Sequence, residues 1–180
     1  MRGACFDRFC RQKDRKWAKM PKPGLDVIDH RIVAALQADG RLTNADLAQR
    51  VGLSASPCLR RVNRLEREGY IEGYRAMLRR DQIGLGLTVF VGVKIARQAN
   101  EMATGFEQAV VGLPEVVACH MISGDTDYLL EVVVPDLDCY RRFLIGKLLE
   151  LAVVHEVRSN IAIQTLKAGG SLPLDHLETR

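Results

Sequence analysis

The stretch that decides the fold runs from Thr43 to Gly69 and reads TNADLAQRVGLSASPCLRRVNRLEREG. Its spacing predicts two short helices joined by a tight turn at Gly52, because apolar residues recur at helical intervals on both sides of this glycine. These residues are Leu47, Ala48 and Val51 in the first helix, and Cys58, Val62 and Leu65 in the second.

The second predicted helix also has a cationic face. Arg60, Arg64 and Arg67 recur at i, i+4 and i+7, and Arg61 lies beside them. A helix-turn-helix places its second helix in the major groove of DNA, with N-terminal residues at base edges and basic side chains among phosphates. The two faces together favour DNA binding. The alternative is a surface hairpin with solvated arginines, since two glutamates near the C-terminal end reduce the charge.

Signals for the start of each helix favour the helix-turn-helix over that alternative. Thr43 and Asp46 have the spacing of a capping box, with Asp in place of Glu. Ser54 or Ser56 can cap the second helix. Pro57 suits only the first turn of a helix, where its missing N–H costs nothing.

Length and composition indicate a globular protein of one large or two small domains. The chain has 180 residues, of which 47% are hydrophobic and 27% charged. We expect a cytoplasmic location, because no apolar run has membrane-spanning length and the N-terminus lacks the apolar core of a signal peptide. The five cysteines form no CxxC pair and the four histidines show no ligand spacing, so we expect reduced thiols and no metal site.

Charge is unevenly distributed along the chain. Residues 1–24 carry eight Lys and Arg against two Asp, residues 25–80 carry ten basic against seven acidic residues, and residues 81–180 carry eight against thirteen. The polyanion-binding part is therefore expected to be N-terminal. For residues 1–24 we favour a disordered basic extension over an arm that follows DNA phosphates, because polar, like-charged termini are commonly disordered.

The helix-turn-helix is expected to belong to a domain of residues 25–78. A helix from Leu25 to about Asp39 precedes it, with Ile28, Ile32 and Leu36 on one face, and Gly40 ends that helix. Residues 70–78 are strand-like and are predicted to form a wing or a linking strand, which makes the domain winged-helix-like. Residues 79–86 are predicted to form the linker.

The C-terminal part, residues 87–174, has the pattern of a ferredoxin-like βαββαβ domain, followed by a tail of residues 175–180. The fold class is therefore α+β. Strands are predicted at 87–95, 116–123, 127–134 and 153–166, with helices at about 100–111 and from Asp136, where Leu137 is expected to point inward. Apolar residues lie on both faces of the second strand, so we expect another subunit to cover the open face of the sheet.

The chain resembles the leucine-responsive regulatory protein/asparagine-operon regulator (Lrp/AsnC) family of transcriptional regulators, over about residues 25–174. In the N-terminal half the matching residues are Leu25-Asp26-x-x-Asp29, Asp39-Gly40-Arg41-Leu42-Thr43, Asp46-Leu47-Ala48, Gly52-Leu53-Ser54 and Arg61-Val62-x-x-Leu65-Glu66-x-x-Gly69-Tyr70-Ile71-x-Gly73-Tyr74. In the C-terminal half they are Glu115-Val116, His120, Ser123-Gly124-Asp125-x-Asp127-Tyr128, Lys167 and Leu172-Pro173-Leu174.

This resemblance implies a DNA-binding domain followed by a sensing domain for an amino acid or related metabolite. It also implies dimers, often assembled to octamers, and no resident cofactor. The candidate DNA contacts are Thr43, Asn44, Ser54, Ser56, Arg60, Arg61 and Arg64, of which Ser54, Ser56 and Arg60 are expected nearest the bases and Thr43, Arg61 and Arg64 nearer phosphates. The candidate effector contacts are Gly124, Asp125, Asp127 and Tyr128. On residue type alone an ordinary hairpin turn is the better explanation of this segment, and the resemblance favours effector contact.

Two other functions compete with a sequence-specific regulator. Some proteins that resemble this family are sirohaem decarboxylases, which act on a tetrapyrrole; here the basic face is intact, and no grouping of His, Tyr and Arg indicates a catalytic pocket. An architectural protein that wraps DNA with little sequence preference would show the same features as a specific regulator.

Overall fold

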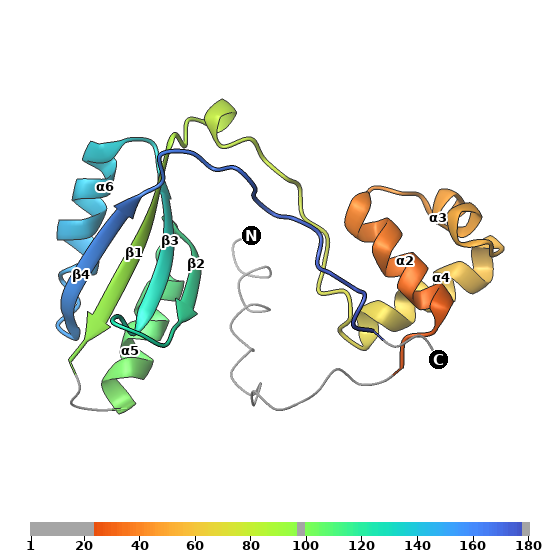
Figure 1. The fold of residues 1–180 in the computed structure, drawn as a ribbon, viewed down its shortest axis with the longest axis horizontal. Coiled ribbons are helices and arrows are strands. Elements are labelled where there is room, and N and C mark those ends of the chain that lie inside the picture. The colour runs from red at the N-terminus through yellow and green to blue at the C-terminus, as the bar shows by residue number, and fades with distance from the viewer. Residues whose placement is uncertain (1–23, 97–99, 178–180) are drawn as a thin grey trace, which may run out of the picture. The chain divides into compact units, whose positions relative to one another are not determined.

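The computed structural model describes residues 24–96 and 100–177, which divide into two compact units (Figure 1). The helical unit comprises the residues up to Arg75 together with those from Gly169 onward. The sheet unit comprises Ala76–Ala168. Residues 87–174 were expected to form one C-terminal domain, whereas residues 169–174 group with the helices.

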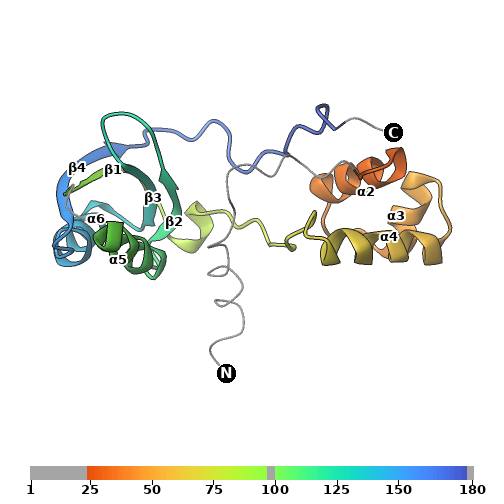
Figure 2. The ribbon, with the colours of Figure 1, turned by 90° about the horizontal axis from the view of Figure 1, so that it is seen from below.

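The helical unit consists of α2 (Val27–Ala38), α3 (Asn44–Val51) and α4 (Ala55–Arg67), as Figures 1 and 2 show. The predicted apolar stripes form its core. The buried residues are Ile32 from α2, Leu47, Ala48 and Val51 from α3, and Cys58 and Leu65 from α4. The turn between α3 and α4 requires Gly52, because its φ of 75° lies in the left-handed region.

No strand forms over residues 70–78. Tyr70 and Ile71 pack against the core of the helical unit, but residues 71–79 have no regular structure. Met77 and Leu78 are 77% and 67% exposed. A strand needs a neighbour that accepts its backbone hydrogen bonds, and no strand of the described residues pairs with this segment. A short 3-10 helix, Asp81–Ile83, lies within the predicted linker.

The C-terminal segment returns to the helical unit. The side-chain amide of Gln37 in α2 donates to the carbonyl oxygen of Leu172 at 3.3 Å, and the backbone N–H of Leu172 donates to Gln37 Oε1 at 2.7 Å. The side chain of Gln37 on α2 therefore binds both the backbone N–H and the carbonyl oxygen of Leu172.

The sheet unit has the predicted ferredoxin-like topology. Its elements are β1 (Leu87–Ile95), α5 (Asn100–Val111), β2 (Val116–Met121), β3 (Tyr128–Val134), α6 (Leu137–Phe143) and β4 (Val154–Ile161). A π-helical turn, Leu144–Leu148, extends α6. The sheet order is β2-β3-β1-β4, and all neighbouring strands are antiparallel.

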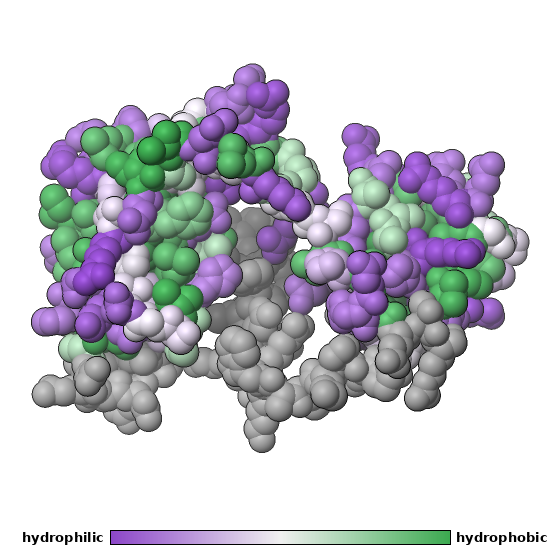
Figure 3. Space-filling view, in the orientation of Figure 1, coloured by the Kyte–Doolittle hydropathy of each residue, from purple (hydrophilic) through white to green (hydrophobic). Residues whose placement is uncertain are grey.

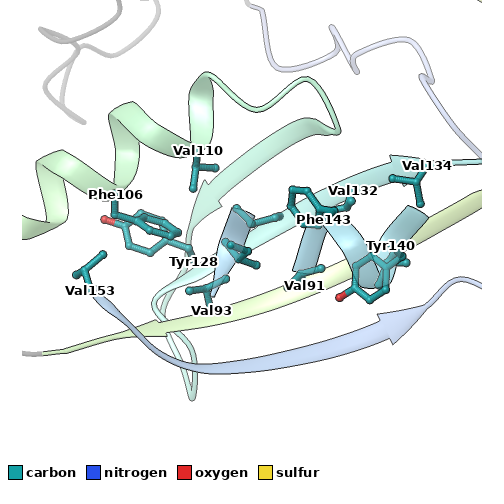
Figure 4. Packing of buried hydrophobic residues seen from close by; sticks show 13 residues of the cluster. Val91, Val93, Phe106, Val110, Tyr128, Val132, Val134, Tyr140, Phe143 and Val153 are labelled. Atoms are coloured by element: carbon teal, nitrogen blue, oxygen red, sulfur yellow. The ribbon is translucent and has the colours of Figure 1, made fainter. Parts of the chain in front are cut away.

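Both helices cover the same face of the sheet (Figure 2), and the core lies between the two layers (Figure 4). Val89, Val91 and Val93 alternate along β1 and are fully buried. The rings of Phe106 on α5 and Tyr128 on β3 pack with centroids 4.8 Å apart. Leu137 does not point inward as expected and is 61% exposed, because it is the first residue of α6.

The opposite face of the sheet carries apolar side chains among polar ones. The strand register places Phe90 between Glu131 and Asn160, and Gly92 between Leu129 and Arg158. Phe90 is 40% exposed. Figure 3 shows apolar surface over the strands of this unit. Coverage of this face by another subunit stays a prediction.

Candidate nucleic-acid interface and effector site

Thr43 and Asn44 fix the geometry of the helix-turn-helix. The Thr43 hydroxyl accepts from the backbone N–H of Asp46 at 3.2 Å and donates to the Asp46 carboxylate at 2.6 Å, so half of the predicted capping box forms. Asn44 donates from its side-chain amide to the carbonyl oxygen of Ala55 at 2.9 Å, which joins the start of α3 to the start of α4. Thr43 therefore caps α3, whereas Asn44 also holds the two helices together.

The N-terminal end of α4 presents small polar groups. Ser54 occupies the N-cap position with an extended backbone, but its side chain makes no capping hydrogen bond. Ser54 and Ser56 are both exposed, and Pro57 lies in the first turn as predicted. Hydroxyls that the helix does not use for capping remain available to base edges or phosphates.

The arginines of α4 fall into two groups. Arg60 and Arg67 are exposed, and among the described residues no carboxylate forms an ion pair with either. Arg61 and Arg64 are 28% and 34% exposed and reach back to the N-terminus of α2. A phosphate contact by Arg61 or Arg64 would have to share or break these internal contacts.

The partners of Arg61 and Arg64 are two carboxylates that the sequence analysis did not include in the site. Arg61 donates to Asp26 at 2.6 Å and to Asp29 at 2.8 Å, and Arg64 donates to the other oxygen of Asp29. Asp26 and Asp29 also cap each other's backbone N–H groups in a capping box. The sequence pattern that could have revealed this pairing is Asp26-x-x-Asp29 at the start of one helix together with Arg61-x-x-Arg64 on a neighbouring helix.

This pairing changes the protonation equilibria of both partners. Desolvation opposes ionisation of Asp26, but the Asp29 backbone N–H and the Arg61 guanidinium outweigh it, so the pKa of Asp26 is held below its usual range. Hydrogen bonds to Asp26 and Asp29 raise the pKa of Arg61. Asp26 and Arg61 are therefore both charged at neutral pH.

The structure does not bring the four candidate effector residues together into one pocket. Gly124 has a φ of 134°, and the Asp125 side chain is 91% exposed, with Arg158 at 3.8 Å. Asp127 accepts from the backbone N–H of Ile95 at 2.8 Å, which ties the hairpin to β1. Of the four candidates, only Gly124 and Asp125 are therefore exposed on the turn.

Tyr128 lies in the core of the sheet unit. It is 3% exposed, and its hydroxyl donates to Glu107 at 3.0 Å. Desolvation and the Glu107 carboxylate raise the pKa of Tyr128 to about 12. Its place in the strict alternation of Tyr128, Leu130 and Val132 was the signal in the sequence, because alternate residues of a strand share a face.

The described residues contain neither a metal-ion cluster nor a membrane-spanning helix. No group of three or more His, Cys, Asp or Glu side chains in residues 24–96 and 100–177 is arranged to hold a metal ion. None of the helices described is both long enough and apolar enough to cross a membrane.

Comparison with known proteins identifies both units. Residues 25–72 match the model of a winged helix-turn-helix DNA-binding domain, and residues 88–172 match the model of the Lrp/AsnC ligand binding domain. The chain is 44% identical over 154 residues to the leucine-responsive regulatory proteins of Klebsiella pneumoniae and Escherichia coli K12, which covers 86% of this chain and 94% of each relative. The chain belongs to the Lrp/AsnC family.

Solved structures of Lrp/AsnC-type regulators share the fold. A transcriptional regulator from Neisseria meningitidis, solved as a complex with L-Met, is 39% identical with a TM-score of 0.82, over 86% of this chain and 100% of that one. An AsnC family transcriptional regulator from Agrobacterium tumefaciens is 38% identical with a TM-score of 0.81, over the same shares. This Lrp/AsnC chain is thus a transcriptional regulator with a DNA-binding helix-turn-helix and a ligand-binding domain.

Proposed function

We propose that this regulator recognises specific DNA sequences through the N-terminal end of α4, and that an amino acid bound by the sheet unit changes this binding. The observation that carries the proposal is the exposure of Ser54, Ser56 and Arg60 at the start of a helix whose opposite face is buried. A helix held in this way presents the same side chains to every DNA site it meets.

An amino-acid effector is the ligand class that the relatives favour. The Neisseria regulator was solved with L-Met, and the Klebsiella and Escherichia relatives are named for their response to leucine. Gly124 and Asp125 form an exposed turn beside Arg158, so an acidic and a basic side chain lie 3.8 Å apart. We propose that such a pair contributes to binding of the charged groups of an amino acid, without a resident cofactor.

We further propose that the regulator acts in the cytoplasm as a homodimer, and that the dimers assemble to octamers. The apolar side chains on the uncovered face of the sheet support an assembly of this kind. Phe90 is 40% exposed there, and an exposed apolar patch rimmed by polar residues is typical of an interaction surface.

The test of the proposal is DNA binding by the purified protein. Binding to the DNA upstream of its own gene is compared with binding to a scrambled duplex of equal length, over a series of salt concentrations. We expect a preference of about a thousandfold or more and affinity that falls steeply with salt. Equal binding to both duplexes would favour the architectural alternative, and no binding to either would contradict the proposal.

Arg60→Ala tests the assignment of the recognition residues. We expect the preference for operator over random DNA to fall by about 1–3 kcal/mol, the usual worth of one bidentate base contact. Arg141→Ala, which removes an exposed arginine of α6, is the matched control and should leave the preference unchanged. An unchanged operator-to-random ratio in Arg60→Ala would show that Arg60 does not read bases.

The effector is tested separately, by thermal unfolding in the presence of single amino acids. An amino acid that binds only the folded protein raises the unfolding temperature, by an amount that grows with the logarithm of its concentration above Kd. We expect at least one amino acid to do so and to change the affinity for operator DNA in the same concentration range. Asp125→Ala should weaken that response, with Asp138→Ala as the control for loss of an exposed carboxylate.

A further inference from the structure

Asp29 is the one buried charged or polar residue of the described chain, with 0% of its surface exposed. Each of its carboxylate oxygens accepts from a different arginine of α4, Oδ1 from Arg61 and Oδ2 from Arg64. Oδ2 also accepts from the backbone N–H of Asp26 at 3.1 Å. The carboxylate is thus saturated by donors from two helices.

We propose that Asp29 is a positioning residue for the recognition helix, and that Arg61 and Arg64 are engaged by it and do not contact DNA phosphates. The proposal rests on the proposed DNA contact of α4 and reverses the role that the sequence pattern suggested for these two arginines. Positive charge for the DNA backbone then comes from exposed arginines that no carboxylate of the described residues neutralises, such as Arg67, while Arg60 is left for the bases.

The geometry supports this division. The side chains of Arg61 and Arg64 converge on Asp29 at the N-terminus of α2. Arg60 and Arg67 point to solvent instead. One helix therefore uses one set of arginines for docking within the domain and another for its outer surface.

Energetics point in the same direction. If Arg61 and Arg64 left Asp29 for phosphates, a fully buried carboxylate would lose both of its charged partners, which is among the costliest changes in a protein interior. A contact with a solvent-exposed phosphate is screened by salt and returns less. The pairing is therefore expected to persist when DNA binds.

The salt dependence of DNA binding distinguishes the two roles. The logarithm of the binding constant falls linearly with the logarithm of salt concentration, and each phosphate contact contributes about 0.9 to the slope. For the full-length protein, we expect Arg61→Gln and Arg64→Gln to lower operator affinity at every salt concentration and to leave the slope unchanged. A slope smaller by about 0.9 in either variant would overturn the proposal.

Arg67→Gln is the matched comparison, since it removes an exposed arginine of the same helix. We expect it to lower the slope by about 0.9 and to leave the thermal unfolding temperature unchanged. Because Arg61→Gln leaves an unpaired charge on Asp26, the double variant Asp26→Asn/Arg61→Gln removes both partners and keeps the Arg64 pair. If Arg61→Gln does not fold, the double variant takes its place: an unchanged slope supports the proposal, and a slope smaller by about 0.9 overturns it.

The second measurement is the energetic coupling between Asp29 and Arg64 in operator binding. If Asp29 acts through Arg64, Asp29→Asn and Arg64→Gln should lower operator affinity by amounts that do not add in the double variant. Strictly additive losses would overturn the positioning role. If the wild-type protein binds no DNA, the proposed function fails; if it binds and the slope falls in Arg61→Gln or Arg64→Gln, only the present inference fails.

Discussion

The surroundings of Tyr128 in the sheet unit raise its pKa. Its hydroxyl is held by Glu107 in the core, and its pKa is raised from 10.0 to about 12. A raised pKa means that the neutral phenol is favoured in the folded state, so this stabilisation is complete below the unfolded value near 10 and is lost as pH rises toward 12. The pKa of Tyr74 is also raised to about 12, so we expect Tyr128→Phe to remove one of the high-pH tyrosine transitions from the near-ultraviolet absorbance and to leave that of Tyr74. An unchanged titration curve in that variant would contradict the assignment.

In the helical unit, Cys58 is a buried residue whose pKa is likewise raised. It is fully buried against α3, and desolvation raises the pKa of its thiol. Since the thiolate is the reactive species, we expect Cys58 to resist alkylation in the folded protein and to react after unfolding. Peptide mapping after brief iodoacetamide treatment measures this, with the partly exposed Cys139 as the internal comparison. Equal labelling of both in the folded state would mean that the core opens readily.

At the scale of single elements, the caps of α3 and α4 differ. Thr43 accepts the Asp46 backbone N–H at the start of α3, whereas Ser54 makes no capping hydrogen bond at the start of α4. We therefore expect Thr43→Ala to lower the free energy of unfolding by about 0.5–2 kcal/mol. Ser54→Ala should change it by no more than about 0.5 kcal/mol, the usual effect of a surface substitution. Equal losses in urea denaturation would contradict this difference between the caps.

Periodicity in the sequence predicted the elements because it determines which face of a helix or strand is apolar. It predicted α2, α3 and α4, and the strand and helix order of the sheet unit. It does not determine the partner of a polar face, which is why the Arg61 and Arg64 contacts with Asp29 were missed. The strand expected over residues 70–78 failed for the same reason, since local β-propensity does not provide a neighbouring strand.

The candidate effector residues in the segment 124–128 show that residue type alone does not identify a binding pocket. Gly124, Asp125, Asp127 and Tyr128 are close in sequence, but alternation along β3 sends Tyr128 into the core, and Asp127 is held by the N–H of Ile95. Asp125 alone of the three polar side chains is almost fully exposed. A pocket needs convergence in space, which adjacency in the chain does not ensure.

At the scale of the whole molecule, we expect the face of the sheet that α5 and α6 leave uncovered to form the dimer interface. We expect Phe90→Glu to weaken the dimer, because a charge in an apolar interface loses its hydration without gaining a partner. Light scattering behind size exclusion gives the mass as a function of concentration. Leu149→Glu, which places the same charge at a residue 49% exposed just beyond the π-helical turn, is the control. Identical masses for wild type and Phe90→Glu would exclude this face as the interface.

The hydrogen bonds between Gln37 and Leu172 have a consequence for synthesis of the chain. They join residues separated by 135 positions, and the whole sheet unit lies between them in the sequence. A ribosome therefore finishes α2, α3 and α4 early, yet the last piece of the helical unit leaves the ribosome only after all four strands have been made. The DNA-binding part of a nascent chain thus remains incomplete until its sensor has been translated.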